Sequence, residues 1–234
     1  TDGDIWYLNT GNTLKFQKSG TTTDFIFKDN NYQFTGATGT TRAIEVDNNG
    51  SIYASRVNVP FGVFNAVSSV TIANTTVETS IISSQLYGTT TLNSSTATTY
   101  QHLVAGKKFR FNARGVISTN AIAPTLRIRA FLGTSAFTDS TAGTLTAALT
   151  GKFFEIDLTF TIRTQGSTGT MIGTGNGEYT TGVVSAAQFV DLGSLGEITI
   201  DTTTDKVFDC KVTFGTADAS NSITIYESTL EYLN

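Results

Sequence analysis

Strict alternation of apolar and polar side chains is the feature that most limits how this chain can fold. Every second residue from Phe154 to Ile162 is apolar, and polar or charged residues stand between them. Successive side chains of a β-strand point to opposite faces, so this pattern predicts a strand with one face in a core and one in water. The predicted core residues are Phe154, Ile156, Leu158, Phe160 and Ile162, and the predicted outward residues include Glu155, Asp157 and Thr159.

The same period of two recurs through the rest of residues 65–234. It is clearest in Lys107–Ala113, Thr125–Leu132 and Val207–Phe214. Further strands are predicted at Ser69–Ala73, Thr79–Tyr87, Thr170–Tyr179, Val183–Asp191, Glu197–Ile200 and Ser222–Leu233. The apolar parity switches inside the last of these stretches, which predicts a β-bulge near Glu227. Because no segment has helical periodicity, residues 65–234 are predicted to form an antiparallel, jelly-roll-like β-sandwich, and the whole chain is predicted to be all-β.

The first part of the chain has a different organisation. Short strands are predicted at Asp4–Leu8, Thr13–Gln17, Asp24–Lys28, Tyr32–Thr35, Arg42–Val46 and Ile52–Arg56. The turns between them are rich in Gly, Asn and Asp, which is typical of a meander of hairpins. Strands this short carry too few apolar side chains to close a core, so residues 1–64 are predicted to be a neck or shaft that associates with other copies. Pro60 and the following Phe61-Gly62-Val63-Phe64 mark a change in pattern, and the domain boundary is predicted at residue 64.

Charge and cysteine content exclude several classes of protein. The 15 Lys and Arg against 19 Asp and Glu give a net charge of −4, opposite in sign to a basic nucleic-acid reader. Cys210, the one cysteine, excludes an intramolecular disulfide and a cysteine-based zinc site. No apolar run is long enough to span a bilayer. Because the chain begins with Thr1, we expect it to be a piece of a longer or processed polypeptide.

Two stretches resemble structural proteins of tailed bacteriophages. They are Gly3-Asp4-Ile5-Trp6-Tyr7 followed by Thr13-Leu14-Lys15-Phe16, and the segment from Phe214 to Thr224. The first is similar to a hairpin unit of tail fibres, and residues 65–234 resemble the jelly-roll tip that ends such fibres. The resemblance implies a homotrimeric fibre end on the virion, with a head that meets the host surface. It implies no cofactor and no catalytic motif at the tip.

Three features that often carry chemistry have simpler interpretations here. His102 precedes a predicted strand and is expected in a surface loop, without partners for a base or a metal. Cys210 falls on a core face, where a thiol behaves as a small hydrophobe. Gly173–Gly177 lacks the Lys-Ser/Thr that follows a phosphate-binding loop, so it is predicted to form a bend or bulge in a strand pair.

Residues of the predicted neck also invite a functional reading. Asp2, Asp4 and Asp47 supply oxygen ligands, but they do not have the spacing of a calcium loop, and turn chemistry explains them. Trp6 and Tyr7 are predicted to anchor a contact between subunits, because paired aromatic side chains are common at interfaces.

A pair of carboxylates sits on the wet face of one predicted strand. Glu155 and Asp157 are about 7 Å apart along that strand. An inverting glycosidase holds its two carboxyl groups at a comparable separation. Two carboxylates on a wet face are also simply solvated, and no other catalytic spacing occurs. We therefore predict that the chain is not an enzyme and has no cofactor or metal.

Two arginines are the candidates for ligand binding. Arg127 and Arg129 alternate with apolar residues, so both guanidinium groups are predicted to project from the outer face of one strand. Arg110 and Arg114, nearby in sequence, are expected to extend this row. Such a row suits an acidic sugar or another anionic partner. It equally suits pairing with acidic residues across a subunit interface, and the sequence does not choose between the two.

These observations favour a virion structural protein, the distal part of a phage tail fibre that trimerises and binds a host-surface glycan or protein. Other virion proteins are expected partners, whereas nucleic acid and membrane insertion are not. The alternatives are another trimeric virion component such as a head fibre or baseplate protein, a carbohydrate-binding module, and a glycan-degrading jelly-roll enzyme. Adhesive specificity resides in loops that follow no general code, so the sequence does not identify the receptor.

Overall fold

The described parts of the chain contain strands and turns and no helix. The computed structural model describes the backbone of the N-terminal strands and residues 62–97, 101–181 and 187–233, with side chains from residue 63 onward. The chain divides into two compact units, Thr1–Asn58 and Val59–Asn234. The all-β prediction is confirmed. The described residues include no helix with the length and apolar character needed to cross a membrane.

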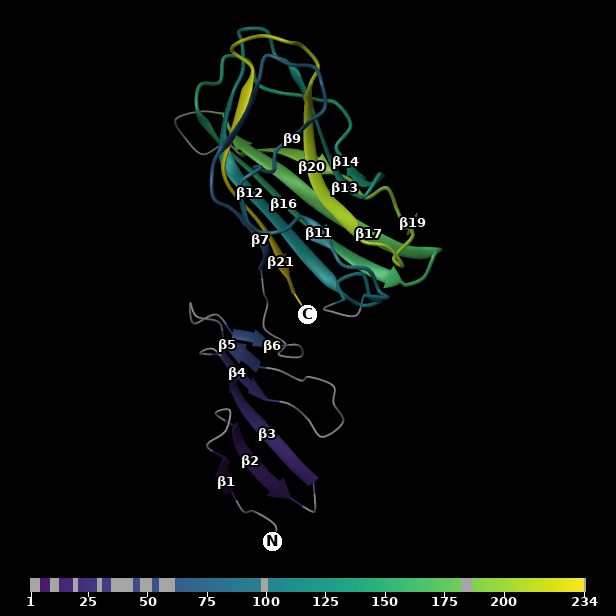
Figure 1. The fold of residues 1–234 in the computed structure, drawn as a ribbon. Coiled ribbons are helices and arrows are strands. Elements are labelled where there is room, and N and C mark those ends of the chain that lie inside the picture. Colours follow the sequence, from purple (N-terminus) through teal and green to yellow (C-terminus); the bar gives the residue numbers. More distant parts are fainter. Residues whose placement is uncertain are drawn as a thin grey trace. The chain divides into compact units, whose positions relative to one another are not determined.

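The N-terminal unit contains two small antiparallel sheets (Figure 1). One sheet pairs its strands in sequence order: β1 (Ile5–Leu8), β2 (Thr13–Lys18), β3 (Thr21–Lys28) and β4 (Asn31–Phe34). The other is the hairpin of β5 (Ile44–Val46) and β6 (Ile52–Ala54). This arrangement confirms the predicted meander of short hairpins. The side chains of Asp2, Asp4, Trp6, Tyr7 and Asp47 lie outside the described residues.

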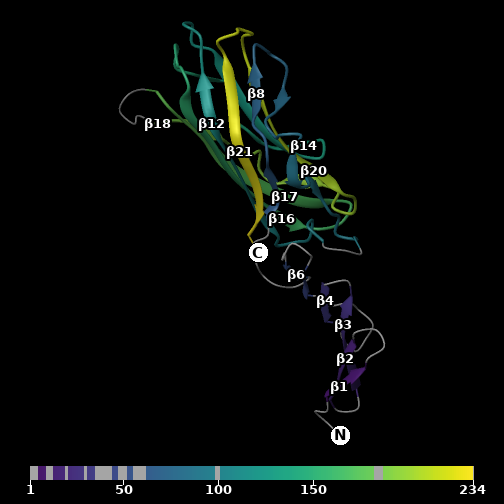
Figure 2. The same ribbon diagram turned by 60° about the vertical axis from the view of Figure 1, so that its left-hand side comes forward.

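The second unit is a sandwich of two antiparallel sheets (Figures 1 and 2). The larger sheet has the order β10-β7-β21-β12-β16-β17-β18, with β8 also beside β21 and β19 also beside β17. Its strands are β7 (Gly62–Ala66), β8 (Val70–Ala73), β10 (Leu86–Gly88), β12 (Lys108–Ser118), β16 (Lys152–Thr164), β17 (Gly169–Thr180), β18 (Ala187–Leu192), β19 (Ile198–Ile200) and β21 (Ser222–Tyr232).

The smaller sheet has the order β11-β20-β13-β14, with β15 also beside β13 and β9 also beside β20. Its strands are β9 (Thr79–Ser80), β11 (Thr91–Leu92), β13 (Thr125–Leu132), β14 (Ser135–Asp139), β15 (Gly143–Thr144) and β20 (Lys206–Phe214). The C-terminal strands β20 and β21 pair with β13 and β12, one in each sheet. This pairing of early with late strands closes the sandwich, as in the predicted jelly-roll-like arrangement. The predicted domain boundary at residue 64 falls inside β7, which belongs to the larger sheet.

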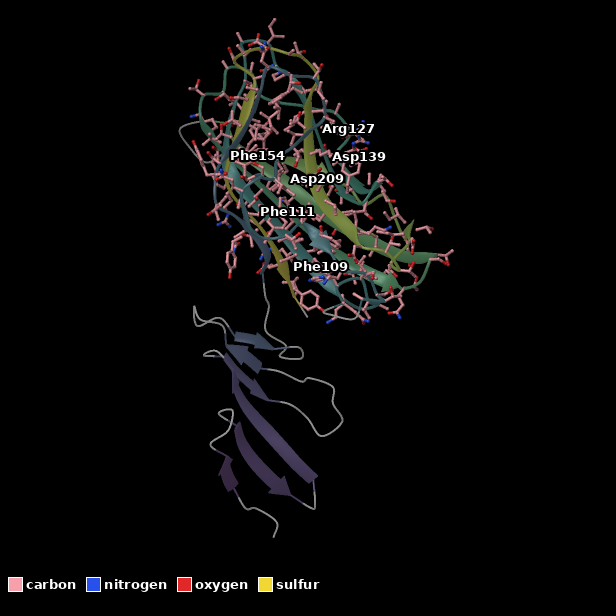
Figure 3. The ribbon with its side chains drawn as sticks, in the orientation of Figure 1. Phe109, Phe111, Arg127, Asp139, Phe154 and Asp209 are labelled. Atoms are coloured by element: carbon pink, nitrogen blue, oxygen red, sulfur yellow. The ribbon has the colours of Figure 1, made fainter. Side chains whose placement is uncertain are left out.

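The core lies between the two sheets, and β16 contributes its whole inner face. All of the core residues predicted for this strand are at most 1% exposed, and Glu155, Asp157 and Thr159 face outward. The ring of Phe160 stacks on Phe109 at 4.9 Å and on Phe208 of the smaller sheet at 5.6 Å. Figure 3 shows Phe109 and Phe154 among the side chains that fill this space. The aromatic stack joins the two sheets, and the predicted face assignment is confirmed.

A β-bulge produces the parity switch of the last strand. Arg114 of β12 is opposite Glu227 of β21, whereas the next residue, Gly115, is opposite Ile225, so Tyr226 is the extra residue. A Cβ on Gly115 would stand 1.9 Å from the carbonyl oxygen of Thr224, so only glycine permits this approach of the two backbones. The predicted bulge near Glu227 is confirmed.

Two local predictions are wrong. The strand predicted at Thr79–Tyr87 is broken into β9 and β10, which belong to different sheets. The hydroxyls of Ser80 and Ser83 each accept a hydrogen bond, 3.1 Å long, from the backbone N–H two residues later, which turns the chain between the sheets.

The second error concerns Gly173–Gly177, which pairs with β16 in regular register without a bend or bulge. These glycines instead make room for neighbours. A Cβ on Gly175 would stand 2.4 Å from the carbonyl oxygen of Asp157, and a Cβ on Gly173 would collide with a ring of the facing sheet.

Candidate functional site

The two candidate arginines lie on the outer face of the smaller sheet and are paired within the chain. Arg127 donates from Nε to Oδ1 of Asp139 at 2.8 Å and from its terminal nitrogen to Oδ2 of the same carboxylate (Figure 3). These bonds hold the pKa of the Asp139 carboxyl below its usual value. Arg129 donates from Nε to Oε1 of Glu78 at 2.6 Å. Each guanidinium is therefore already paired with a carboxylate through Nε and one terminal nitrogen.

The same face carries an aromatic side chain beneath two cations. Phe131 follows the outward parity of Arg127 and Arg129, yet it is only 9% exposed. The guanidinium carbon of Arg129 lies 5.0 Å from its ring centroid, and Nζ of Lys211 lies 4.9 Å from it. Asp209 accepts from the Ser80 hydroxyl and lies 3.7 Å from Lys211. This face is a charge-balanced network in which the cations cover an apolar ring.

Arg110 and Arg114 do not extend this row. Both lie on β12 of the larger sheet, whereas Arg127 and Arg129 lie on β13 of the smaller sheet, so the outward side chains of the two pairs are on opposite faces of the sandwich. A period of two fixes which residues share a face of one strand but not which sheet the strand joins.

The carboxylate pair of β16 is held by β12. Arg110 donates from Nε and its terminal nitrogen to Asp157. Arg114 donates to Oε1 of Glu155 at 3.0 Å, and Asn112 donates to the same oxygen at 2.7 Å. The structure therefore places both acids in hydrogen-bonded ion pairs on an open sheet face.

His102 lies in the connection before β12, as predicted, but it is half-buried rather than fully exposed. Its Nδ1 accepts a hydrogen bond from the backbone N–H of Asn93 at 2.9 Å, and the backbone N–H of His102 donates to the carbonyl of Asn93 at 3.1 Å. Burial, together with the charge of Lys107, lowers the pKa of His102 to about 4. The imidazole is therefore neutral near pH 7 and acts as a hydrogen-bond acceptor in the loop.

Cys210 is fully buried, as predicted. Burial raises the pKa of its thiol, so the thiolate needed for nucleophilic or metal chemistry is disfavoured. Among the residues that the structure describes, no three His, Cys, Asp or Glu side chains gather as metal ligands.

A cleft of about 600 Å³ opens at one end of the sandwich. Three segments line the cleft: the β13–β14 turn, the end of β19 and the start of β20. They contribute, in that order, Thr134 and Ser135, Thr199 and Asp201, and Asp205 and Lys206. Because β19 belongs to the larger sheet and the other strands to the smaller, the cleft lies where the ends of the two sheets separate.

Hydrogen bonds fix both acids of the cleft. Oδ1 of Asp201 accepts from the N–H and the hydroxyl of Thr203, at 2.9 and 2.6 Å, and these bonds lower the pKa of Asp201. Oδ1 of Asp205 accepts from the N–H of Ser94 at 2.7 Å. No described residue donates to Oδ2 of Asp205, and Oδ2 of Asp201 accepts a long hydrogen bond of 3.5 Å from the Thr204 hydroxyl. The short hydrogen bonds to each carboxylate are therefore made to Oδ1, and Oδ2 of both acids can accept a further donor.

Thr202 anchors the loop that carries these acids. It is completely buried, and its carbonyl accepts from the N–H of Ser95 at 2.7 Å. Its N–H donates to the carbonyl of Gly166 at 3.0 Å, and its hydroxyl accepts from the N–H of Gly166 at 2.8 Å. Three loops are thus tied together behind the cleft. The sequence reading missed this site because its residues come from three distant segments, and the run Asp201 to Asp205 resembles ordinary turn composition.

Comparisons with known proteins do not identify a family. No family model matches the chain, and no curated protein matches it. Among solved structures, the CBM2 module of the evolved Dit of Lactobacillus casei BL23 phage J-1 aligns at 16% identity and a TM-score of 0.27, over 62% of this chain and 67% of that one.

The infectious bursal disease virus Gt strain structure aligns at 11% identity and a TM-score of 0.29, over 97% of this chain and 47% of that one. The chain therefore spans about half the length of this second structure. TM-scores this low do not establish a shared fold.

Proposed function

We propose that this chain is a non-enzymatic virion protein, the distal part of a phage tail fibre that trimerises and presents its sandwich unit to a host-surface ligand. The proposal that the chain is not an enzyme rests on one observation: the side chains that could act in catalysis are buried or already bonded to other groups of the chain. Glu155 and Asp157 are ion-paired, Cys210 is buried, and the half-buried His102 accepts a backbone hydrogen bond. A general base or nucleophile needs a partner and access to substrate, and these groups lack that combination.

The proposal of a trimer rests on the N-terminal unit. Its four-stranded sheet and its two-stranded hairpin are too small to bury a substantial core within one chain. Association of three copies would supply the missing partners, and the likeness of Gly3–Tyr7 and Thr13–Phe16 to tail-fibre hairpins favours this arrangement.

The adhesive role rests on the sandwich as a rigid scaffold. Its outward-facing strand positions carry many hydroxyl and amide side chains, as in Thr159, Thr174 and Asn176, together with paired charges. Polar groups on a rigid scaffold suit weak recognition of a polar surface, and three copies on one fibre would multiply weak single-site binding through avidity.

Two measurements test the proposal. Light scattering of the 234-residue chain at micromolar concentration is expected to give the mass of a trimer, and a monomer would contradict the fibre assignment. The purified trimer is then expected to adhere to susceptible cells and to block adsorption of virions that carry this chain.

If the trimer neither adheres to cells nor blocks virion adsorption, the adhesive role is wrong. The chain would then be better explained as a virion component that attaches to the particle, such as a head fibre or baseplate protein. Catalytic release of sugar fragments from host polysaccharide would contradict the non-enzymatic assignment.

A further inference from the structure

We propose that the cleft between the β13–β14 turn, the end of β19 and the start of β20 binds a neutral saccharide. This inference rests on the proposed adhesive function and specifies the site and the class of ligand. A volume of about 600 Å³ falls within the range of small-molecule sites, roughly 300–1,000 Å³. The cleft also gathers side chains from both sheets, which fixes their separation through the sandwich rather than through a single loop.

The two acids supply fixed acceptors for sugar hydroxyls. Asp201 and Asp205 are each held through Oδ1. Oδ2 of Asp205 has no donor among the described residues, and Oδ2 of Asp201 has only the long 3.5 Å contact from the Thr204 hydroxyl, so both oxygens can accept from a ligand. A carboxylate accepts hydrogen bonds from hydroxyls more strongly than a neutral group does, and prior fixation reduces the entropy lost on binding. Because its hydrogen bonds lower the pKa of Asp201, this group stays ionised and acts as an acceptor rather than as an acid.

Lys206 supplies a donor and limits the charge that the cleft accepts. Its Nζ donates to the hydroxyl of Thr204 at 2.7 Å, and that hydroxyl lies 3.5 Å from Oδ2 of Asp201, so the ammonium is near that carboxylate. Two carboxylates against one ammonium leave the cleft with a net negative charge, so an acidic sugar is disfavoured. The nearby ammonium also disfavours a metal cation between the two acids.

Apolar surface lies beside these polar groups. The Lys206 stem passes over Gly133, whose absent Cβ would stand 3.1 Å from Cδ of the lysine. Val207 is 49% exposed at the same edge. Together the stem and the valine offer a surface for the C–H faces of a sugar ring. The combination of acceptors, a donor and an apolar edge matches a neutral, hydroxyl-rich ring.

The site can be tested by saturation-transfer NMR on the intact 234-residue chain. The probes are methyl glycosides of glucose, galactose, mannose and N-acetylglucosamine, with sodium glucuronate as the acidic comparison. At least one neutral glycoside is expected to receive saturation, and glucuronate is expected to receive none. Asp201→Asn is expected to weaken binding by about tenfold, the loss that corresponds to one charge-assisted hydrogen bond.

A second variant tests the cleft without removing a hydrogen bond. Thr134→Trp places a bulky ring at an exposed turn position on the cleft wall and is expected to abolish binding. Asp191→Asn and Thr174→Trp, both at exposed positions on the larger sheet, are the matched controls and are expected to bind as the parent does.

Each remaining outcome overturns the inference. Glycoside binding that survives both cleft variants would place the saccharide site elsewhere. Binding of no neutral glycoside, or stronger binding of glucuronate, would overturn the assignment of the ligand class. If the trimer still adheres to cells in these cases, the proposed function stands while the cleft assignment fails. If the trimer also fails to adhere to cells, both the proposed adhesive function and the cleft assignment are wrong.

Discussion

Gly173 of β17 lies against the ring of Phe137 of β14, so closely that a Cβ on the glycine would stand 2.3 Å from Cδ2 of the phenylalanine. Phe137 is fully buried, and its ring centroid lies 5.0 Å from that of Phe160. Since β14 belongs to the smaller sheet and β17 to the larger, the missing side chain allows an aromatic ring of one sheet to reach the backbone of the other.

Gly173→Ala is therefore expected to destabilise the sandwich. The added methyl group must displace Phe137 or separate the strands, and overpacking of this kind costs about 1–3 kcal/mol in the free energy of unfolding. Urea denaturation monitored by circular dichroism measures the change. Gly193→Ala is the control, because its Cβ would meet only the carbonyl oxygen of Asp139 at 3.8 Å. Equal effects of the two substitutions would contradict this account.

The aromatic stack predicts a larger loss for Phe160→Ala. Phe160 packs against rings on several sides and is 1% exposed, so its removal leaves a cavity that the neighbouring rings cannot fill. Such truncations cost about 3–5 kcal/mol. Phe153→Ala on the outer face of the same strand, where the side chain is 41% exposed, is expected to cost about 1 kcal/mol or less. A loss for Phe160→Ala as small as that of the control would mean that the stack does not stabilise the fold.

The strands and their inner faces could be predicted because period-two patterning reports local geometry. The Phe154–Ile162 core face, the burial of Cys210 and the bulge next to Glu227 follow from parity alone. The break in the strand predicted at Thr79–Tyr87 could not be predicted in this way, because it depends on serine hydroxyls that compete for backbone donors. The role of Gly173–Gly177 could not be predicted either, because these glycines make room for groups outside the run, such as the ring of Phe137 at Gly173 and the carbonyl of Asp157 at Gly175.

His102 predicts a pH dependence of stability. Its pKa is about 4 in the folded chain against a usual value of 6.5, so between these values the unfolded chain binds the proton more tightly. The contribution of His102 to the free energy of unfolding is therefore fully present above about pH 6.5. The free energy of unfolding falls by up to about 3 kcal/mol as the pH decreases toward 4. The lowered pKa values of Asp139, Asp201 and Asp218 act at lower pH, below the usual aspartate value of 3.8.

The substitution His102→Asn distinguishes the contribution of the histidine to the pH dependence of stability from that of other titrating groups. His102→Asn retains an oxygen that can accept from the N–H of Asn93 but cannot gain a proton in this range. Urea denaturation at a series of pH values is expected to show a flatter stability profile between pH 6.5 and 4 for this variant than for the parent. Parallel profiles would show that the imidazole is not responsible.

The candidate binding residues illustrate what sequence patterning omits. Arg127 and Arg129 do share an outer face, as predicted, but their partners Asp139 and Glu78 approach from β14 and from the segment before β9. Asp139 lies on the next strand of the β13–β14 hairpin, whereas Glu78 comes 51 residues before Arg129, and its approach is decided by the sheet topology. The same topology brings Thr134, Asp201 and Asp205 to one cleft, which no local motif marks.

Arg127→Gln is expected to affect stability rather than adhesion. The substitution removes the ion pair with Asp139 at a partly exposed position, where such pairs contribute about 1 kcal/mol or less. Cell adhesion by the trimer is expected to match that of the parent, because the guanidinium is already engaged. The paired assay is urea denaturation and a cell-binding titration. Loss of adhesion with unchanged stability would return Arg127 to the role of a ligand-binding residue.

Removal of residues 1–58 tests whether the sandwich unit folds on its own and whether the N-terminal unit supplies the contacts between subunits. The sandwich unit has its own core and its own internal contacts, so the truncated chain is expected to unfold cooperatively, with a midpoint close to that of the intact chain's sandwich. Trimerisation is expected to weaken, because the N-terminal hairpins are proposed to supply the contact between subunits. Analytical ultracentrifugation over a range of concentrations measures both the mass and its concentration dependence. If the truncated chain remains a trimer at the same concentrations as the intact chain, the contacts between subunits lie on the sandwich. The first surface to substitute would then be the exposed edge strand β18, where Phe189 is 68% exposed.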